Sequence, residues 1–210
     1  IEYTTKLVCR GANFSYLLLL VVALPCMFEV DFFLSKWLTE VPPCACVFVQ
    51  LTLLNSLVEI LLNSNEVLNR ATGKIRNFQI IVSIAQLLII VFSYLVLKMT
   101  GNSIWTMAVA NIVYLLIFIP RITVNKPYIG ISFALFFDHV LRGIIIVTLL
   151  SASICFLFQS SYAQGCLRFI GTCIISTVSI CITSWIFVLT KSERDKIRNF
   201  VRKKMFISWH

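Results

Sequence analysis

Charged residues are scarce in this chain. Only 13% of its 210 residues are charged, and just nine of them are acidic, whereas soluble domains carry about 25% charged residues. Hydrophobic residues make up 59% of the sequence, and the mean hydropathy is +0.92. This composition excludes an ordinary soluble domain and predicts an all-α, polytopic membrane bundle.

Catalytic and metal-binding groups are also few. The chain has two histidines, His139 and His210, and no Ser/His/Asp or Cys/His set or Gly-rich phosphate loop accompanies them. Cys44 and Cys46 form a C-x-C pair without a second Cys pair or a His at zinc spacing. We therefore predict that the protein is not an enzyme, and we predict no metal site and no cofactor beyond a coupling ion.

Six apolar segments are long enough to cross a bilayer, because about 20 residues at 1.5 Å rise per residue span roughly 30 Å. They are 14–30, 44–69, 78–97, 104–119, 140–158 and 167–189. Between the first two, Asp31–Val41 is too polar to span and predicts a short interfacial helix anchored by Trp37. Gly73, after the second, suits a left-handed helix C-cap. The predicted organisation is a transmembrane bundle over 1–190 and a basic tail over 191–210.

Lysine and arginine gather on one side of this predicted bundle. Assigning each cation by its loop places fifteen on one side and three on the other, which together make the 18 of the chain. Such an excess marks the cytoplasmic side and predicts that both termini are cytoplasmic. The net charge of +9 therefore indicates orientation in a lipid bilayer, and we predict no nucleic-acid partner.

A polar stripe runs through the second apolar segment. Asn55, Glu59, Asn63, Glu66 and Arg70 follow one another at spacings of four, four, three and four, so they share one face of a helix. A carboxylate near the bilayer centre costs at least about 2–3 kcal/mol, so this stripe is expected to face protein or water. Two interpretations stay open: a helix that lines a polar passage, and a helix whose polar groups pair with partner helices.

Five short sequence segments follow one another along the chain. They are LVCRGANFSYLLLLVVALP (Leu7–Pro25), FLSKWLTEVPP (Phe33–Pro43), QLTLLNSLVE (Gln50–Glu59), ATGKIRNFQI (Ala71–Ile80) and FVLTKSERDKIRNFVRKKM (Phe187–Met205). In this order they resemble the C-terminal half of bacterial polysaccharide and O-antigen flippases, in the multidrug/oligosaccharidyl-lipid/polysaccharide exporter superfamily. The resemblance covers nearly the whole chain, and Ala71–Ile80 with the helix before it is its most telling part.

The resemblance implies a protein of about 12–14 helices in two lobes around a central cavity, working by alternating access. Its cargo would be an undecaprenyl-diphosphate-linked oligosaccharide. The protein would move it to the periplasmic leaflet of the bacterial inner membrane during surface polysaccharide and lipopolysaccharide synthesis. Because the chain has six predicted helices and begins at Ile1 rather than Met, we expect a fragment, one lobe of such a MATE-like transporter. A missing N-terminal lobe or a second copy would complete the cavity.

A diphosphate and a sugar chain need polar and cationic groups to replace their water. The candidate cavity residues are Asn55, Glu59, Asn63, Glu66, Gln86, Asn111 and Tyr114. The candidate diphosphate residues are Arg70, Lys74 and Arg121 at the cytoplasmic mouth and Arg168 near the exit. For each cation the positive-inside rule alone is an alternative, and Asn111 and Gln86 equally fit interhelical hydrogen bonds.

Glu59 is the deepest acidic residue of the stripe. Two roles for it stay open: a titrating site that couples transport to H⁺ or Na⁺, and a permanent hydrogen bond to a neighbouring helix. Two further functions also stay open. Glu59 and Glu66 favour a cation-coupled multidrug antiporter of the same superfamily, although the mouth is basic, and a non-transporting membrane subunit or gene remnant is the third hypothesis.

Overall fold

The computed structural model describes residues 2–73, 75–124, 132–163 and 165–189, together with Arg194, Asp195 and Arg198. Within these ranges all regular secondary structure is helical. The elements are α1 (Glu2–Phe28), α2 (Val30–Trp37), α3 (Ala45–Thr72), α4 (Arg76–Thr100), α5 (Ile104–Thr123), α7 (Phe133–Phe136), the π-helical turn η1 (Phe137–Leu141), α8 (Arg142–Ser161) and α9 (Cys166–Phe187). The predicted basic tail lies largely outside the described residues.

Six of the described helical segments are long and apolar enough to cross a membrane. They are Thr4–Phe28, Ala45–Ala71, Arg76–Thr100, Ile104–Thr123, Phe133–Ser161 and Cys166–Phe187. The structure thus confirms the predicted all-α, polytopic membrane bundle. The short helix α2 lies between the first two spans, where the polar stretch predicted an interfacial helix.

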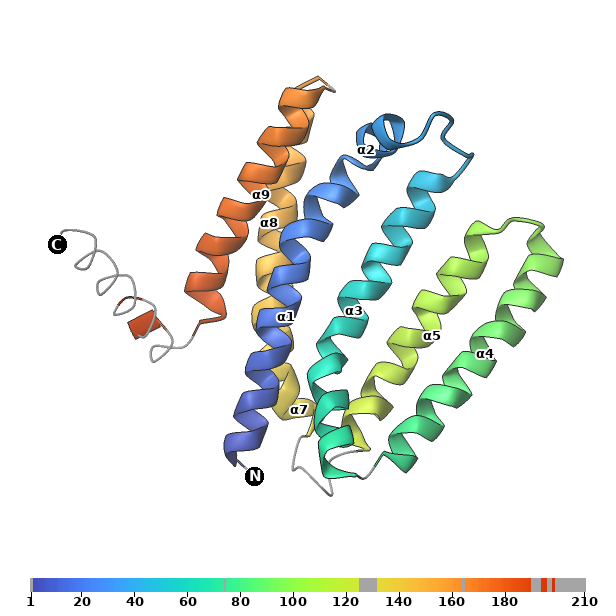
Figure 1. Ribbon diagram of the computed structural model, residues 1–210, viewed down its shortest axis with the longest axis vertical. Coiled ribbons are helices and arrows are strands. Elements are labelled where there is room, and N and C mark those ends of the chain that lie inside the picture. The colour runs from blue at the N-terminus through green and yellow to red at the C-terminus, as the bar shows by residue number, and fades with distance from the viewer. Residues whose placement is uncertain are drawn as a thin grey trace.

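The six spans run alternately up and down beside one another (Figure 1). α4 packs on α5, α5 packs on α3, and α3 packs on α1, while α8 and α9 pack on each other and on the other side of α1. α1 therefore connects two groups of helices. One is a single layer formed by α3, α5 and α4, and the other is the α8–α9 pair. α4 lies at the outer edge of the layer (Figure 1).

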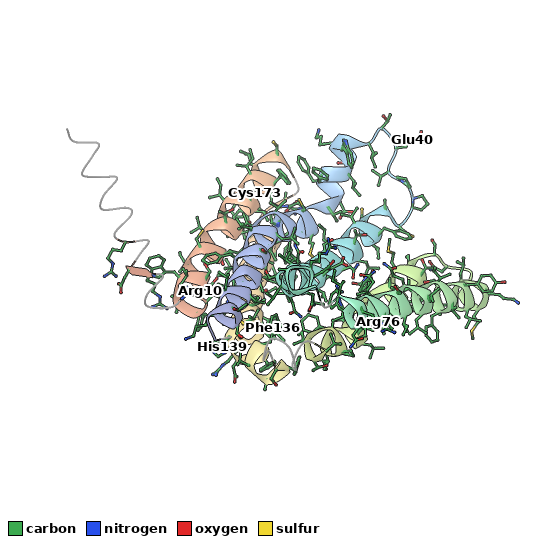
Figure 2. The ribbon with its side chains drawn as sticks, turned by 60° about the horizontal axis from the view of Figure 1, so that its bottom comes forward. Arg10, Glu40, Arg76, Phe136, His139 and Cys173 are labelled. Atoms are coloured by element: carbon green, nitrogen blue, oxygen red, sulfur yellow. The ribbon has the colours of Figure 1, made fainter. Side chains whose placement is uncertain are left out.

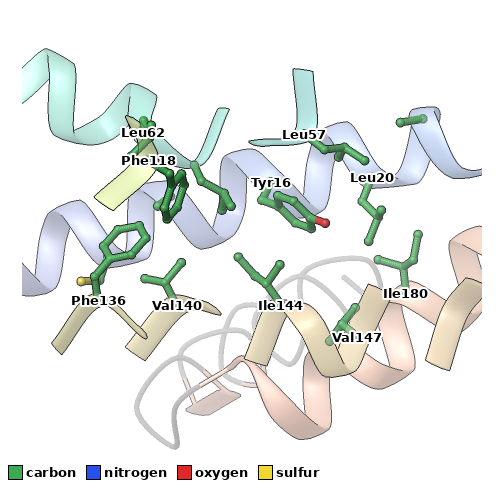
Figure 3. Packing of buried hydrophobic residues seen from close by; sticks show 14 of the residues in the cluster. Tyr16, Leu20, Leu57, Leu62, Phe118, Phe136, Val140, Ile144, Val147 and Ile180 are labelled. Carbon is green, nitrogen blue, oxygen red and sulfur yellow. The ribbon is translucent and has the colours of Figure 1, made fainter. Parts of the chain in front are cut away.

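The core lies where α1 meets α3 on one side and α8 on the other (Figure 3). Tyr16 and Leu20 of α1 are buried between Leu57 of α3 and Ile144 of α8, and the Tyr16 hydroxyl lies 3.0 Å from Thr148 Oγ1. Burying side chains of this size contributes about 1.5–3 kcal/mol each in water, although in lipid helix association depends more on close packing. Packing around α1 therefore fixes the arrangement.

Several helix boundaries differ from those expected from hydropathy, and the fifth span, predicted over 140–158, covers Phe133–Ser161. α1 begins at Glu2 rather than near residue 14, because its polar first turns bury Thr5, Val8 and Cys9 against the bundle. α5 continues through Pro120 to Thr123, since a proline this close to a helix end disturbs few backbone hydrogen bonds. Gly73 caps α3 with φ +71°, as its position predicted.

The described cations divide unequally between the two ends of the bundle. We call one end the basic end; it carries Lys6, Arg10, Arg70, Arg76, Arg121 and Arg142. Figure 2 shows Arg10, Arg76 and His139 toward this end and Glu40 and Cys173 toward the other. The alternation of the helices thus brings together cations that are far apart in the sequence.

Candidate functional site

The polar stripe of the second span occupies one face of α3. The opposite side, with Leu57 and Leu61, is buried in the core. The stripe itself is exposed or half-exposed along its length, although it belongs to a segment that is apolar enough to cross a membrane. We call it the polar face of α3; it comprises Thr52, Asn55, Ser56, Glu59, Asn63, Glu66 and Arg70.

The hydroxyl groups of this face donate hydrogen bonds to backbone carbonyls of α3 itself. Thr52 Oγ1 donates to the Phe48 carbonyl at 2.7 Å, and Ser56 Oγ donates to the Thr52 carbonyl at 2.9 Å. Asn55 differs, because its Oδ1 is buried and has no hydrogen-bond partner within the described ranges. A buried amide oxygen normally has a partner, so Asn55 Oδ1 is an unsatisfied acceptor on this face.

An ion-pair cluster closes the basic end of the polar face. Glu66 pairs with Arg70 on the next turn of α3, and its other carboxylate oxygen lies 3.7 Å from an Arg121 guanidinium nitrogen of α5. Arg121 is only 3% exposed and lies over the Phe78 ring of α4 at 5.3 Å. Asn65 donates to the Arg121 carbonyl at 3.3 Å. Arg121 therefore ties three helices together, whereas Arg70 stays exposed.

Glu59 and Tyr114 lie near each other where α3 meets α5. Glu59 is exposed, Tyr114 is half-buried, and the carboxylate acts electrostatically on both Tyr114 and Arg121. Asn111, one turn before Tyr114, donates to the Leu51 carbonyl of α3 at 3.2 Å and to its own helix. Asn111 thus makes the interhelical bond that was one of its two predicted roles, and Glu59 is the accessible acid of the site.

The remaining candidates do not all join this cluster. Asn63 is exposed on the polar face, and Gln86 is exposed on α4, whose packing partner is α5 rather than α3. Lys74 lies outside the described residues. Eight of the candidates thus share the α3–α5 region: Asn55, Glu59, Asn63, Glu66, Arg70, Asn111, Tyr114 and Arg121.

Arg168 lies at the other end of the bundle in a buried ion pair. Its guanidinium NH2 is 2.8 Å from Glu29 Oε2, with the two side chains 8% and 0% exposed. Arg168 also donates to the Tyr162 carbonyl at 3.2 Å, and Thr172 donates to Glu29 at 3.4 Å. The pair joins the α1–α2 junction to the start of α9, so Arg168 faces protein rather than an exit opening.

Glu29 is a structural residue that the sequence analysis did not select. It is separated from Arg168 by 139 residues, and no local spacing links the two. A signal was nevertheless present, because the loop assignment places both residues at the same, non-basic end of the bundle. Each of them lies at the end of an apolar span. An acid and a base at the same membrane boundary are natural partners.

The described residues contain no group of three or more His, Cys, Asp and Glu side chains placed to hold a metal ion. Comparison with known protein families, curated proteins and solved structures finds no match to this chain. Any assignment of function therefore depends on the polar face of α3 and on the ion pairs at its basic end.

Proposed function

We propose that this chain is one lobe of a membrane flippase that moves an undecaprenyl-diphosphate-linked oligosaccharide from the cytoplasmic leaflet of the bacterial inner membrane to the outer one. The observation that carries the proposal is the polar face of α3, which is exposed along a membrane span. A carboxylate and amides cannot face hydrocarbon at low cost. They therefore face a water-filled passage or a partner that encloses one.

The side chains of this face suit a sugar phosphate. Asn55 and Asn63 can donate to and accept from hydroxyl groups, while Arg70 at the opening is an exposed cation for a diphosphate. Arg121 contributes positive charge behind Glu66 without itself being exposed. In this proposal Arg70 receives the diphosphate and the amides replace part of the water lost by the sugars.

The proposal requires a second wall, because the polar face of α3 is open on one side in this chain. An N-terminal lobe or a second copy of the chain would supply that wall, as in two-lobe transporters with their site near the midplane. The basic end is cytoplasmic in this proposal, following the excess of Lys and Arg at that end.

Glu59 supports a second candidate, a cation-coupled multidrug antiporter. Its carboxylate is exposed within the span and acts electrostatically on Tyr114 of α5, and an acid in the same region as an aromatic side chain suits a lipophilic cation. The two candidates differ in cargo charge. A flippase needs the cations of the opening, whereas an antiporter needs the acid.

The test is to deplete cells of the native full-length protein and analyse lipid extracts for undecaprenyl-diphosphate-linked glycans. We expect a complete repeat unit to accumulate on the lipid while surface polysaccharide falls. Complementation with Asn63→Leu should leave the glycan accumulated, and complementation with Leu87→Ile, a matched change at an exposed apolar position of α4, should restore export. Unchanged lipid with new sensitivity to cationic dyes would instead identify the antiporter.

A further inference from the structure

A second line of polar residues lies on α4, at the outer edge of the three-helix layer. Gln79, Ser83 and Gln86 follow one another at spacings of four and three, so they share one face of the helix. All three are exposed, and none of their side chains makes a hydrogen bond within the described part of the chain. We call these three residues the polar row of α4. Because the row belongs to a segment that is apolar enough to cross a membrane, Arg76–Thr100, it is expected to face water or polar protein.

Another exposed face of α4 is apolar. Ile80, Ile84, Leu88 and Val91 are exposed and lie at spacings of four, four and three, so they share a face that is separate from the polar row. α4 thus has three sides: one packs on α5, one is apolar and suits lipid, and one carries the polar row. Such a division of the exposed surface is the pattern of a helix that borders two environments.

The direction of the polar row follows from the contacts that α3 and α4 make with α5. On α3, Asn65 donates to the Arg121 carbonyl of α5 at 3.3 Å, and the next residue, Glu66, belongs to the polar face. On α4, the Phe78 ring lies 5.3 Å from the Arg121 guanidinium, and the next residue, Gln79, belongs to the polar row. In each helix the polar residues are therefore turned by one residue step, about 100°, from the side that contacts α5.

The polar row of α4 and the polar face of α3 consequently lie on the same side of the layer. α3 and α4 lie on opposite flanks of α5 and run in opposite directions (Figure 1). For right-handed helices in this arrangement, the same rotation from the α5 contact turns both sets of residues to one side. Tyr114 of α5 precedes Arg121 by seven residues and so shares its face, and Arg121 pairs with Glu66 of the polar face. One side of the layer therefore carries polar groups from all three helices.

We propose that Gln79, Ser83 and Gln86 line the transport passage together with the polar face of α3 and bind the hydroxyl groups of the cargo's sugars. This inference rests on the proposed function and adds α4 to its site. Amide and hydroxyl side chains both donate and accept hydrogen bonds, as sugar hydroxyl groups do. The polar row carries no charge, so it suits the sugars, while the diphosphate lies with Arg70. The second wall of the passage then covers the layer of α3, α5 and α4 rather than α3 alone.

The access of water to the polar row can be measured in membrane vesicles. Ser83→Cys and Gln86→Cys should react with a membrane-impermeant maleimide, because the row borders a hydrated passage. Ile84→Cys and Leu88→Cys lie within two residues of them along the span but on the apolar face. These two control positions should stay unreacted, since only a thiol in contact with water ionises and reacts. Peptide mass spectrometry assigns each label among the eight native cysteines.

The binding of sugars is tested by export in cells that lack the native protein. One net hydrogen bond is worth about a five-fold change in affinity, so Gln79→Leu with Gln86→Leu should lower export at limiting cargo by about 25-fold. Lipid-linked glycan should accumulate in these cells. Gln79→Asn with Gln86→Asn keeps both amides and should restore part of the export, and Ile80→Leu with Leu88→Ile on the apolar face should export at the native rate. The amount of each variant in the membrane is measured in parallel and should equal that of the native protein.

The outcomes separate this inference from the proposed function. Reaction at Asn63→Cys without reaction at Ser83→Cys or Gln86→Cys would overturn the inference alone, because the passage would border α3 and not α4. Protection of both helices would overturn the inference and the proposed function together. Equal reaction at the two apolar control positions would mean that water surrounds α4 on every side. Native export by the double leucine variant of the row would mean that the row touches water but no sugar, and either of these last two results overturns the inference.

Discussion

Polar side chains within the spans fall into two groups. One group is closed: Glu29 with Arg168 and Glu66 with Arg121 each place an acid against a buried guanidinium. The other group is accessible, as with Glu59 and Asn63 on the polar face of α3. Closed pairs hold helices together at the two ends of the bundle, whereas accessible groups between the ends need water, cargo or a partner chain. The site proposal depends on this second group.

The Glu29–Arg168 pair predicts a large stability effect. Glu29→Gln preserves the size of the side chain but leaves the Arg168 charge buried without its carboxylate. Breaking a buried pair from one side typically costs about 3–5 kcal/mol. We expect a marked loss of thermal stability in detergent, with the α1–α2 junction becoming accessible to protease before the rest of the bundle.

The control for this prediction replaces both partners. Glu29→Met with Arg168→Met removes the two charges together, so no uncompensated ion remains, and such exchanges are often neutral or stabilising. The double variant should therefore be more stable than Glu29→Gln. If Glu29→Gln unfolds at the same temperature as the native protein, the ion pair contributes no stability. Arg168 would then again be a candidate diphosphate residue near the exit.

At the scale of the helices, the hydropathy of the sequence and the helical spacing of its polar residues explain most of the fold. The spacing of Asn55, Glu59, Asn63 and Glu66 predicted one face, and α3 presents them on one face. Sequence reasoning could not extend α1 back to Glu2, because its polar first turns are helical through burial against other helices rather than through their own hydrophobicity. It also did not pair Glu29 with Arg168, since contacts between distant helices leave no periodic trace and only the loop assignment placed both charges at the same end of the bundle.

The contact between α1 and α3 predicts an element-level effect at Gly11. A Cβ placed there would lie 2.7 Å from Ser64 Oγ and 3.4 Å from Ser64 Cβ. Gly11→Ala should therefore force the two helices or the Ser64 rotamer to shift, at a cost of about 1–3 kcal/mol when the site cannot adjust. Thermal unfolding of the purified protein measures the change.

Ser64→Ala provides the matching second step of a double-mutant cycle. It removes the hydroxyl that the new Cβ would meet and leaves only an ordinary contact at 3.4 Å. Gly11→Ala in the Ser64→Ala background should cost less than in the native background, giving a coupling of the size that contacting residues show. Additive effects of the two substitutions would mean that the helices do not approach closely at this point.

At the scale of the whole molecule, the arrangement leaves two kinds of open surface. α4 packs on α5, and most of the exposed residues along its middle, such as Leu87, Ile90 and Val91, are apolar, with Ser83 and Gln86 as the polar exceptions. α3 lies between α1 and α5, yet its polar face is exposed. The first surface suits lipid directly. The second does not, so within a membrane this face of α3 needs water or polar protein against it.

This difference predicts unequal access of water to two positions within the spans. In membrane vesicles, Asn63→Cys should react with a membrane-impermeant maleimide, because the proposed function places the polar face of α3 beside a hydrated passage. Leu87→Cys on α4 should stay unreacted in lipid, since a thiol must reach water to ionise and react. Peptide mass spectrometry separates these sites from the eight native cysteines. Equal protection of both positions would mean that partner helices cover the polar face, which would favour a non-transporting subunit over a flippase.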